Sequence, residues 1–148
     1  MSTDTNQELI TKLIVMKAFP DPFRKRIAPV FEEVSETKTL QEGSYLFHLG
    51  DKSVNDGFIV LSGTIRIMKR VIPPYKAEAP ALLGEMRQSK MESERSADVY
   101  ALEEIEFLHF DWDRFHNLLK ERLARSEYAI FSRALSDYSW LHLQPDEV

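Results

Sequence analysis

The spacing of apolar positions changes twice along the chain and divides it into three parts. In the first part, apolar residues recur every three or four positions, as on one face of a helix; they are Leu9, Ile10, Leu13 and Ile14. Pro20 and Pro22 end this helix. The apolar residues of 23–31 predict a second short helix, distorted at Pro29. We therefore predict N-terminal helices over about residues 6–34.

The second part, residues 37–110, contains short apolar runs separated by turn residues. Runs at 44–47, 58–61 and 64–67 are typical of strands, and strand-like spacing returns at 98–110. Glycines cut these runs; they are Gly43, Gly50, Gly57 and Gly63. Many short strands with regular punctuation indicate a β-sandwich or β-barrel.

Three connections in this second part can also be predicted. Residues 61–64, Leu-Ser-Gly-Thr, indicate a tight hairpin turn. Residues 71–81 contain three prolines and predict an irregular connection. Residues 86–94 are polar and lack glycine, which favours a helical turn followed by a loop.

The third part, residues 111–143, returns to helical spacing. Asp111 is expected to cap a helix, because a carboxylate can accept hydrogen bonds from the first free N–H groups. The apolar residues of this helix and of a final one are Phe115, Leu118, Leu119, Tyr128, Phe131, Leu135, Tyr138 and Leu141. Pro145 ends the final helix. The predicted order is helices, β-roll, helices, within a single domain of residues 1–148.

Composition narrows the function. The 148 residues carry a formal charge of −5. This argues against direct nucleic-acid binding, which needs a basic face, but leaves room for one small anion. The chain has no cysteine, a polar N-terminus without the features of a signal peptide, and no apolar run long enough to cross a bilayer. We predict a cytoplasmic protein with no membrane partner.

The segment with the clearest chemistry is LGEMRQSKMESERSADV, residues 83–99. Gly84 lets the backbone come close to a ligand, and a helical turn near Glu85 would point free N–H groups at an anion. Arg95 can grip phosphate oxygens with two parallel hydrogen bonds. Ser96 and Ala97 are small enough to leave room for that anion. The pattern indicates a cradle for a ribose phosphate.

This segment resembles the phosphate-binding cassette of cyclic-nucleotide-binding domains. The spacing from Glu85 to Arg95 and the string Glu-Arg-Ser-Ala at 94–97 are most similar to the sensory domain of the bacterial catabolite activator protein. EGSYLFHLGD at 42–51 and GFIVLSGTIRI at 57–67 are similar to the early strands of the family. The resemblance implies a mainly β fold with flanking helices (α+β), a double-stranded β-helix or jelly-roll barrel.

The resemblance also implies a function and a site. The chain would be a regulatory sensor rather than an enzyme, with cAMP as its ligand and cGMP as the alternative. Glu85 would bind the ribose 2′-hydroxyl and Arg95 the cyclic phosphate. Backbone or hydroxyl contacts would come from Gly84, Met86 and Ser96, with Ala97 packing beside them. The signal would pass to the C-terminal helix and to an output domain or partner that the sequence does not identify.

The C-terminal helix carries two further expectations. An aromatic residue in the turn 138–141, Tyr138 or Trp140, can cover the base by stacking on it. The same helix carries an apolar stripe that can instead form a homodimer seam; its members are Phe131, Leu135, Tyr138 and Leu141.

Other readings of the same residues remain open. Arg95 can be a surface arginine paired with Glu92 or Glu94. Arg87 and Gln88 replace the small and apolar residues usual in the family, which favours a degenerate jelly roll that binds no nucleotide and serves protein interaction or dimerisation. A metal-dependent jelly-roll enzyme would need a close His-x-His pair, whereas the four histidines are scattered; they are His48, His109, His116 and His142. We expect no metal and no cofactor.

Overall fold

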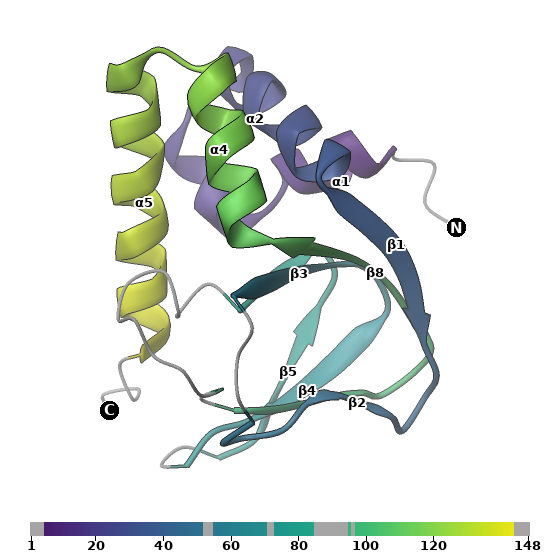
Figure 1. Ribbon diagram of the computed structural model, residues 1–148. Helices are drawn as coiled ribbons and strands as arrows, with labels where there is room; N and C mark the ends of the chain where they lie inside the picture. Colours follow the sequence, from purple (N-terminus) through teal and green to yellow (C-terminus); the bar gives the residue numbers. More distant parts are fainter. Residues whose placement is uncertain (1–4, 52–54, 71–72, 85–94, 96, 144–148) are drawn as a thin grey trace.

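A computed structural model describes the chain over residues 5–51, 55–70, 73–84, 95 and 97–143, with the backbone alone over 139–143. Helices gather over one face of a β-roll, and the last helix runs down beside the roll (Figure 1). The helices are α1 (Asn6–Thr11), the 3-10 helix η1 (Ile14–Ala18), α2 (Asp21–Glu33), α4 (Trp112–Arg122) and α5 (Arg125–Leu143). The predicted cap is confirmed, because the Asp111 carboxylate accepts a 2.9 Å hydrogen bond from the Arg114 N–H.

The β-roll consists of two four-stranded antiparallel sheets that are not closed into a barrel. The sheet next to the helices has the order β1-β8-β3-β6, and the outer sheet has the order β2-β7-β4-β5. The strands of the first are β1 (Ser35–Leu40), β8 (Ile105–Asp111), β3 (Asp56–Ser62) and β6 (Ala81–Leu83). Those of the second are β2 (Tyr45–Phe47), β7 (Asp98–Ala101), β4 (Thr64–Met68) and β5 (Tyr75–Glu78). The prediction of a mainly β fold with flanking helices is confirmed.

Strand β3 separates two hydrophobic cores. Its side chains alternate, so Phe58 and Val60 enter the core between the sheets, and Ile59 and Leu61 enter the core under the helices. All four are buried. A strand covered on both faces has a continuous apolar sequence, which explains why 58–61 is easy to recognise as a strand.

The predicted hairpin turn at 61–64 is wrong. Ser62 ends β3 in one sheet and Thr64 begins β4 in the other. Both edges of β3 are already occupied, by β8 and β6, so β4 cannot pair with it. Gly63 has a φ of 96°, in the left-handed region that glycine tolerates, and marks the crossing between the sheets.

The predicted irregular connection at 71–81 is also wrong in its second half. Strand β5 occupies Tyr75–Glu78, and β6 begins at Ala81. The prolines lie outside these strands, and β5 is an edge strand paired only with β4. Proline removes a strand only where its missing N–H is needed in the ladder. The helical turn predicted at 86–94 and the helix end at Pro145 lie outside the described residues.

No helix in the described ranges is long and apolar enough to span a membrane.

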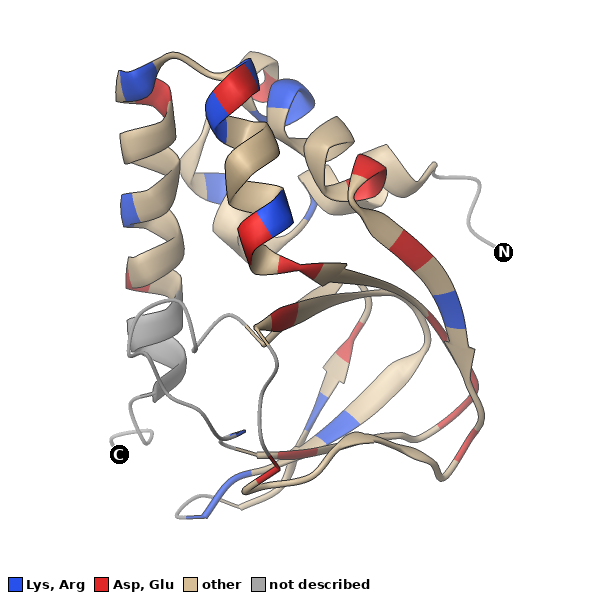
Figure 2. Cartoon of the chain, viewed as in Figure 1, with Lys and Arg blue, Asp and Glu red and all other residues tan. Residues whose placement is uncertain are grey.

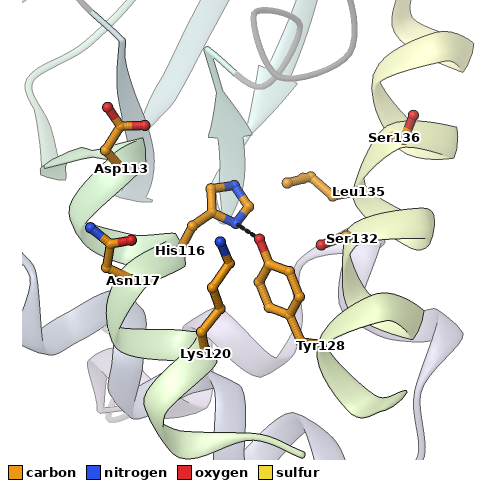
Figure 3. A pocket seen from close by; sticks show the side chains of 8 residues that line it. All are labelled: Asp113, His116, Asn117, Lys120, Tyr128, Ser132, Leu135 and Ser136. Atoms are coloured by element: carbon orange, nitrogen blue, oxygen red, sulfur yellow. Dashed lines mark hydrogen bonds between the residues drawn. The ribbon is translucent and has the colours of Figure 1, made fainter. Parts of the chain in front are cut away.

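The contact between α4 and α5 contains a partly buried histidine. The ring of His116 lies against Trp112 and Phe115, and its Nδ1 is 2.9 Å from the Tyr128 hydroxyl on α5 (Figure 3). Burial lowers the pKa of His116 below its ordinary value of 6.5; Lys120 lowers it further, and Asp113 opposes this shift. His116 is therefore neutral in the folded chain at neutral pH.

This lowered pKa predicts how stability depends on pH. Because the unfolded chain binds a proton at His116 more readily, the contribution is complete above about pH 6.5 and is lost as the pH falls through the folded pKa. The free energy of unfolding, measured by urea denaturation between pH 8 and pH 5, should fall less with acid in His116→Gln than in the parent. Parallel pH profiles of the two chains would contradict the assignment.

Candidate functional site

Two buried charges meet at one end of the space between the sheets. Asp56 begins β3 on the same face as Phe58, and only 8 % of its surface is exposed. Arg95 precedes β7 in the outer sheet and is 9 % exposed. One terminal nitrogen of Arg95 donates to Oδ1 of Asp56. A salt bridge therefore links the two sheets at this end of the roll.

The guanidinium of Arg95 is held from several sides. Its carbon lies 4.7 Å from the ring centre of Phe47, on β2, and 5.3 Å from that of Phe58. The backbone N–H of Arg95 donates to the Asp51 carbonyl at 2.8 Å. The backbone carbonyl of Arg95 accepts from the Gly50 N–H at 3.0 Å. Aromatic faces attract a cation. The two backbone hydrogen bonds fix the position of the Arg95 Cα, from which the side chain extends. Arg95 is thus preorganised.

Asp56 has a second partner, His109 on β8. The Nε2 atom of His109 lies 2.7 Å from Oδ2 of Asp56, and the ring stacks on Phe58 with centres 4.9 Å apart. On the other side of the ring, Nδ1 lies 2.9 Å from the Lys38 ammonium. An ammonium only donates, so Nδ1 accepts from Lys38 and Nε2–H donates to Asp56. The polar chain runs Lys38, His109, Asp56, Arg95.

Gly84 follows β6 at the same end of the roll. Its φ is 87°, and a Cβ there would lie 2.8 Å from the Asp56 carbonyl oxygen and 3.1 Å from Nη1 of Arg95. The Trp112 indole donates to the Gly84 carbonyl at 3.3 Å. Only glycine fits here, because the backbone of β3 and the guanidinium of Arg95 both lie close to Gly84. The predicted close approach of this backbone to a ligand stays a prediction.

Three of the predicted site residues lie in the described part of the chain: Gly84, Arg95 and Ala97. Gly84 lies against the Arg95 guanidinium, and Ala97 is buried in the core between the sheets. Arg95 is not a surface arginine, so that reading is wrong. Glu85, Met86 and Ser96 lie outside the described residues.

The predicted features of the C-terminal helix are placed only in part. Phe131 and Leu135 are buried in the core under the helices, and Tyr138 packs against that core. A dimer seam built on Phe131 and Leu135 is therefore wrong, because the chain covers them itself. The side chains of Trp140 and Leu141 lie outside the described residues.

Sequence reasoning missed Asp56 and His109. Their interaction depends on the register between β3 and β8, which puts Phe58 opposite His109 although they are far apart in sequence. One signal was available at Asp56: it is a carboxylate directly before a run of apolar residues expected to be buried. Buried carboxylates require a partner, and this one is a counter-charge for a buried arginine.

This arrangement suits a small anion better than a long polyanion. Arginine has five N–H donors in a planar fork that matches phosphate oxygens. Elsewhere, acidic and basic residues are mixed over the helices and strands (Figure 2). In the described part of the chain, no group of three or more histidines, cysteines or carboxylates could hold a metal ion.

The buried salt bridge makes a prediction about stability. Asp56→Asn removes a charge that pairs with the buried Arg95 and should lower the free energy of unfolding by about 3–5 kcal/mol. The control is Asp137→Asn, whose side chain is 69 % exposed and 3.8 Å from Arg133, and which should cost less than about 1 kcal/mol. Urea denaturation measures both.

The double variant Asp56→Asn, Arg95→Met separates charge from packing. Removing both charges should recover part of the lost stability, because no uncompensated charge remains buried. An Asp56→Asn chain as stable as the Asp137→Asn chain would contradict the buried pair.

Comparison with known proteins identifies a family. The sequence profile of the cyclic nucleotide-binding domain family matches residues 37–122, more than half of the chain. No curated protein is significantly similar to it in sequence.

Among solved structures, it is similar to the regulatory domain of Toxoplasma gondii PKA with cAMP, with a TM-score of 0.62 and 19 % identity over 90 % of this chain and 49 % of that one. The Thermus thermophilus catabolite activator protein gives a TM-score of 0.62 and 20 % identity over 80 % of this chain and 55 % of that one. A protein from a cyclic-GMP-dependent signalling pathway that regulates bacterial phytopathogenesis gives a TM-score of 0.65 and 20 % identity. The match covers 79 % of this chain and 93 % of that one.

The chain spans about half the length of the first two of these structures. At such identities the likeness shows the fold, and the sequence profile shows the family. The chain belongs to the family of cyclic nucleotide-binding domains.

Proposed function

We propose that the chain is a sensor that binds cAMP, with cGMP as the alternative, at the end of the β-roll where Arg95 meets Gly84. The observation that carries this proposal is the placement of the Arg95 guanidinium: it is buried, lies against the rings of Phe47 and Phe58, and is next to Gly84. A guanidinium fixed in this way loses little conformational freedom when it binds a phosphate.

The residue roles follow the family pattern. Arg95 binds the cyclic phosphate, and the backbone at Gly84 lies close to the same group. Glu85 binds the ribose 2′-hydroxyl, Met86 and Ser96 contribute further polar contacts, and Ala97 supports them from the core. The position of Ala97, 5 % exposed between the sheets, is compatible with this supporting role.

Asp56 sets the energetic balance of this site. It neutralises Arg95 before any ligand arrives, so the phosphate must share the guanidinium or displace the carboxylate. Sharing is open to arginine because its five donors exceed what one carboxylate oxygen uses. His109 and Lys38 hold Asp56 in place from the other side.

The signal passes, in this proposal, through α5. Tyr138 or Trp140 covers the base, and ligand binding shifts the helix relative to the roll, which changes its contacts with an output domain or partner. Such coupling requires that the ligand bind the two helix positions with different affinities. A homodimer through α5 would use its outward face, where Ile130 is 55 % exposed, because Phe131 and Leu135 are already packed internally.

A second candidate is a degenerate domain that binds no nucleotide and serves protein interaction. One observation favours it: Asp56 neutralises the charge of the Arg95 guanidinium without any ligand. Arg87 and Gln88 in the cassette also favour a domain that binds no nucleotide.

Calorimetric titration with cAMP and cGMP separates the two candidates and tests Arg95. Arg95→Lys keeps the charge but loses the planar fork, and should weaken cAMP binding about tenfold to a hundredfold. Glu85→Gln should also weaken it while leaving the Arg95–Asp56 pair in place. Arg133→Lys, at a side chain 83 % exposed on α5, is the matched control and should change nothing.

Thermal unfolding of each variant verifies that it is folded. A parent chain that binds neither nucleotide would establish the degenerate domain. A folded Arg95→Lys chain that binds cAMP as tightly as the parent would remove Arg95 from the site.

A further inference from the structure

A second cavity lies between α4 and α5, and none of its lining residues belongs to the proposed nucleotide site. Its volume is about 490 Å³, within the ~300–1,000 Å³ usual for small-molecule sites. The side chains that line it converge from the two helices (Figure 3). They are Asp113, His116, Asn117, Lys120, Tyr128, Ser132, Leu135 and Ser136.

The charges of this cavity are separated along α4. Lys120 points towards α5, with its ammonium 5.3 Å from the ring centre of Tyr128 (Figure 3). Asp113 lies two turns away, about 10 Å along the helix axis. Both charges act on His116, in opposite directions. Within the described residues, no carboxylate forms an ion pair with Lys120.

The wall formed by α5 contains hydroxyl groups. The Tyr128 hydroxyl is 2.9 Å from Nδ1 of His116. The Ser132 hydroxyl oxygen is buried and has no hydrogen-bond partner in the described part of the chain. Almost all buried polar atoms in folded proteins have a partner, so this hydroxyl calls for one that is not a described residue. Ser132 lines the cavity, although its oxygen exposes almost no surface.

The histidine between these groups adds no charge at neutral pH. Burial and the neighbouring Lys120 lower the pKa of His116, so its ring is neutral there. Lys120 is then the one charge at its end of the cavity among the described lining residues. An ammonium beside a hydroxyl is the donor set that binds an anionic oxygen.

We propose that the α4–α5 cavity is a second binding site, for a small ligand with a carboxylate or phosphate group bound by the Lys120 ammonium. The Tyr128 ring forms the wall of this site, and Asp113 lies at its far end (Figure 3). A carboxylate and a phosphate share the chemistry that these donors recognise, so the probes below distinguish them.

The test is a titration of the full chain with sodium phosphate and, separately, sodium acetate, followed by nuclear magnetic resonance of backbone amides and the histidine ring. Sodium chloride at equal ionic strength is the salt control. At least one of the two anions should produce saturable shifts at residues 116–132, and should raise the pKa of His116 because a bound anion stabilises the imidazolium. The anion with the stronger effect identifies the ligand class.

Two variants and a control locate the effect. Lys120→Met keeps the apolar stem and should weaken binding about tenfold or more, since hydrogen bonds to charged groups dominate such sites. Ser132→Ala should weaken it less. Lys25→Met removes an exposed lysine of α2 and should leave binding unchanged.

Three results would overturn the proposal. One is the absence of saturable shifts with either anion, which would mean that water alone fills the cavity. Another is equal binding by parent and Lys120→Met. The third is a set of shifts confined to Gly84 and Arg95, which would place the anion in the β-roll. None of these results depends on cAMP binding, so the proposed nucleotide site is tested independently.

Discussion

The salt bridge between Arg95 and Asp56 is the interaction on which the proposed site depends. It joins a loop of the outer sheet to the central strand of the inner sheet, at the end where β6 stops. Without it, the guanidinium would lack the partner that holds it beside Gly84, inside the roll. The geometry of the site is therefore a consequence of one pair of buried charges and the contacts that hold them.

Burying such a pair costs desolvation free energy, so the pair need not stabilise the fold. Desolvation of two charges can cancel their attraction, so a buried salt bridge is weak evidence for stability. Here the surrounding contacts reduce the cost: two neighbouring aromatic rings lie against the cation, and His109 donates to the second oxygen of Asp56. We interpret the pair as a device that positions Arg95. A hydrophobic pair could stabilise the fold, but it could not bind phosphate.

The fold could be predicted from sequence wherever the local sequence alone identifies a strand or a helix. The run 58–61 is apolar because both faces of β3 are covered, and Asp111 was recognisable as a cap from its position before a helical pattern. The hairpin at 61–64 could not be judged locally, because whether β3 pairs with β4 depends on β8 and β6 having taken its edges. Arg95 was identified through its motif, but Asp56 and His109 were not, since strand register alone brings them together.

The central claim is that the preorganised Arg95 guanidinium receives the phosphate of a cyclic nucleotide. A crystal structure of the full chain grown with cAMP tests it most directly. The account predicts the cyclic phosphate at the open end of the roll, with an Arg95 nitrogen about 2.7–2.9 Å from a phosphate oxygen and Gly84 beside it. Nucleotide bound elsewhere, with no phosphate oxygen at Arg95, would contradict the account.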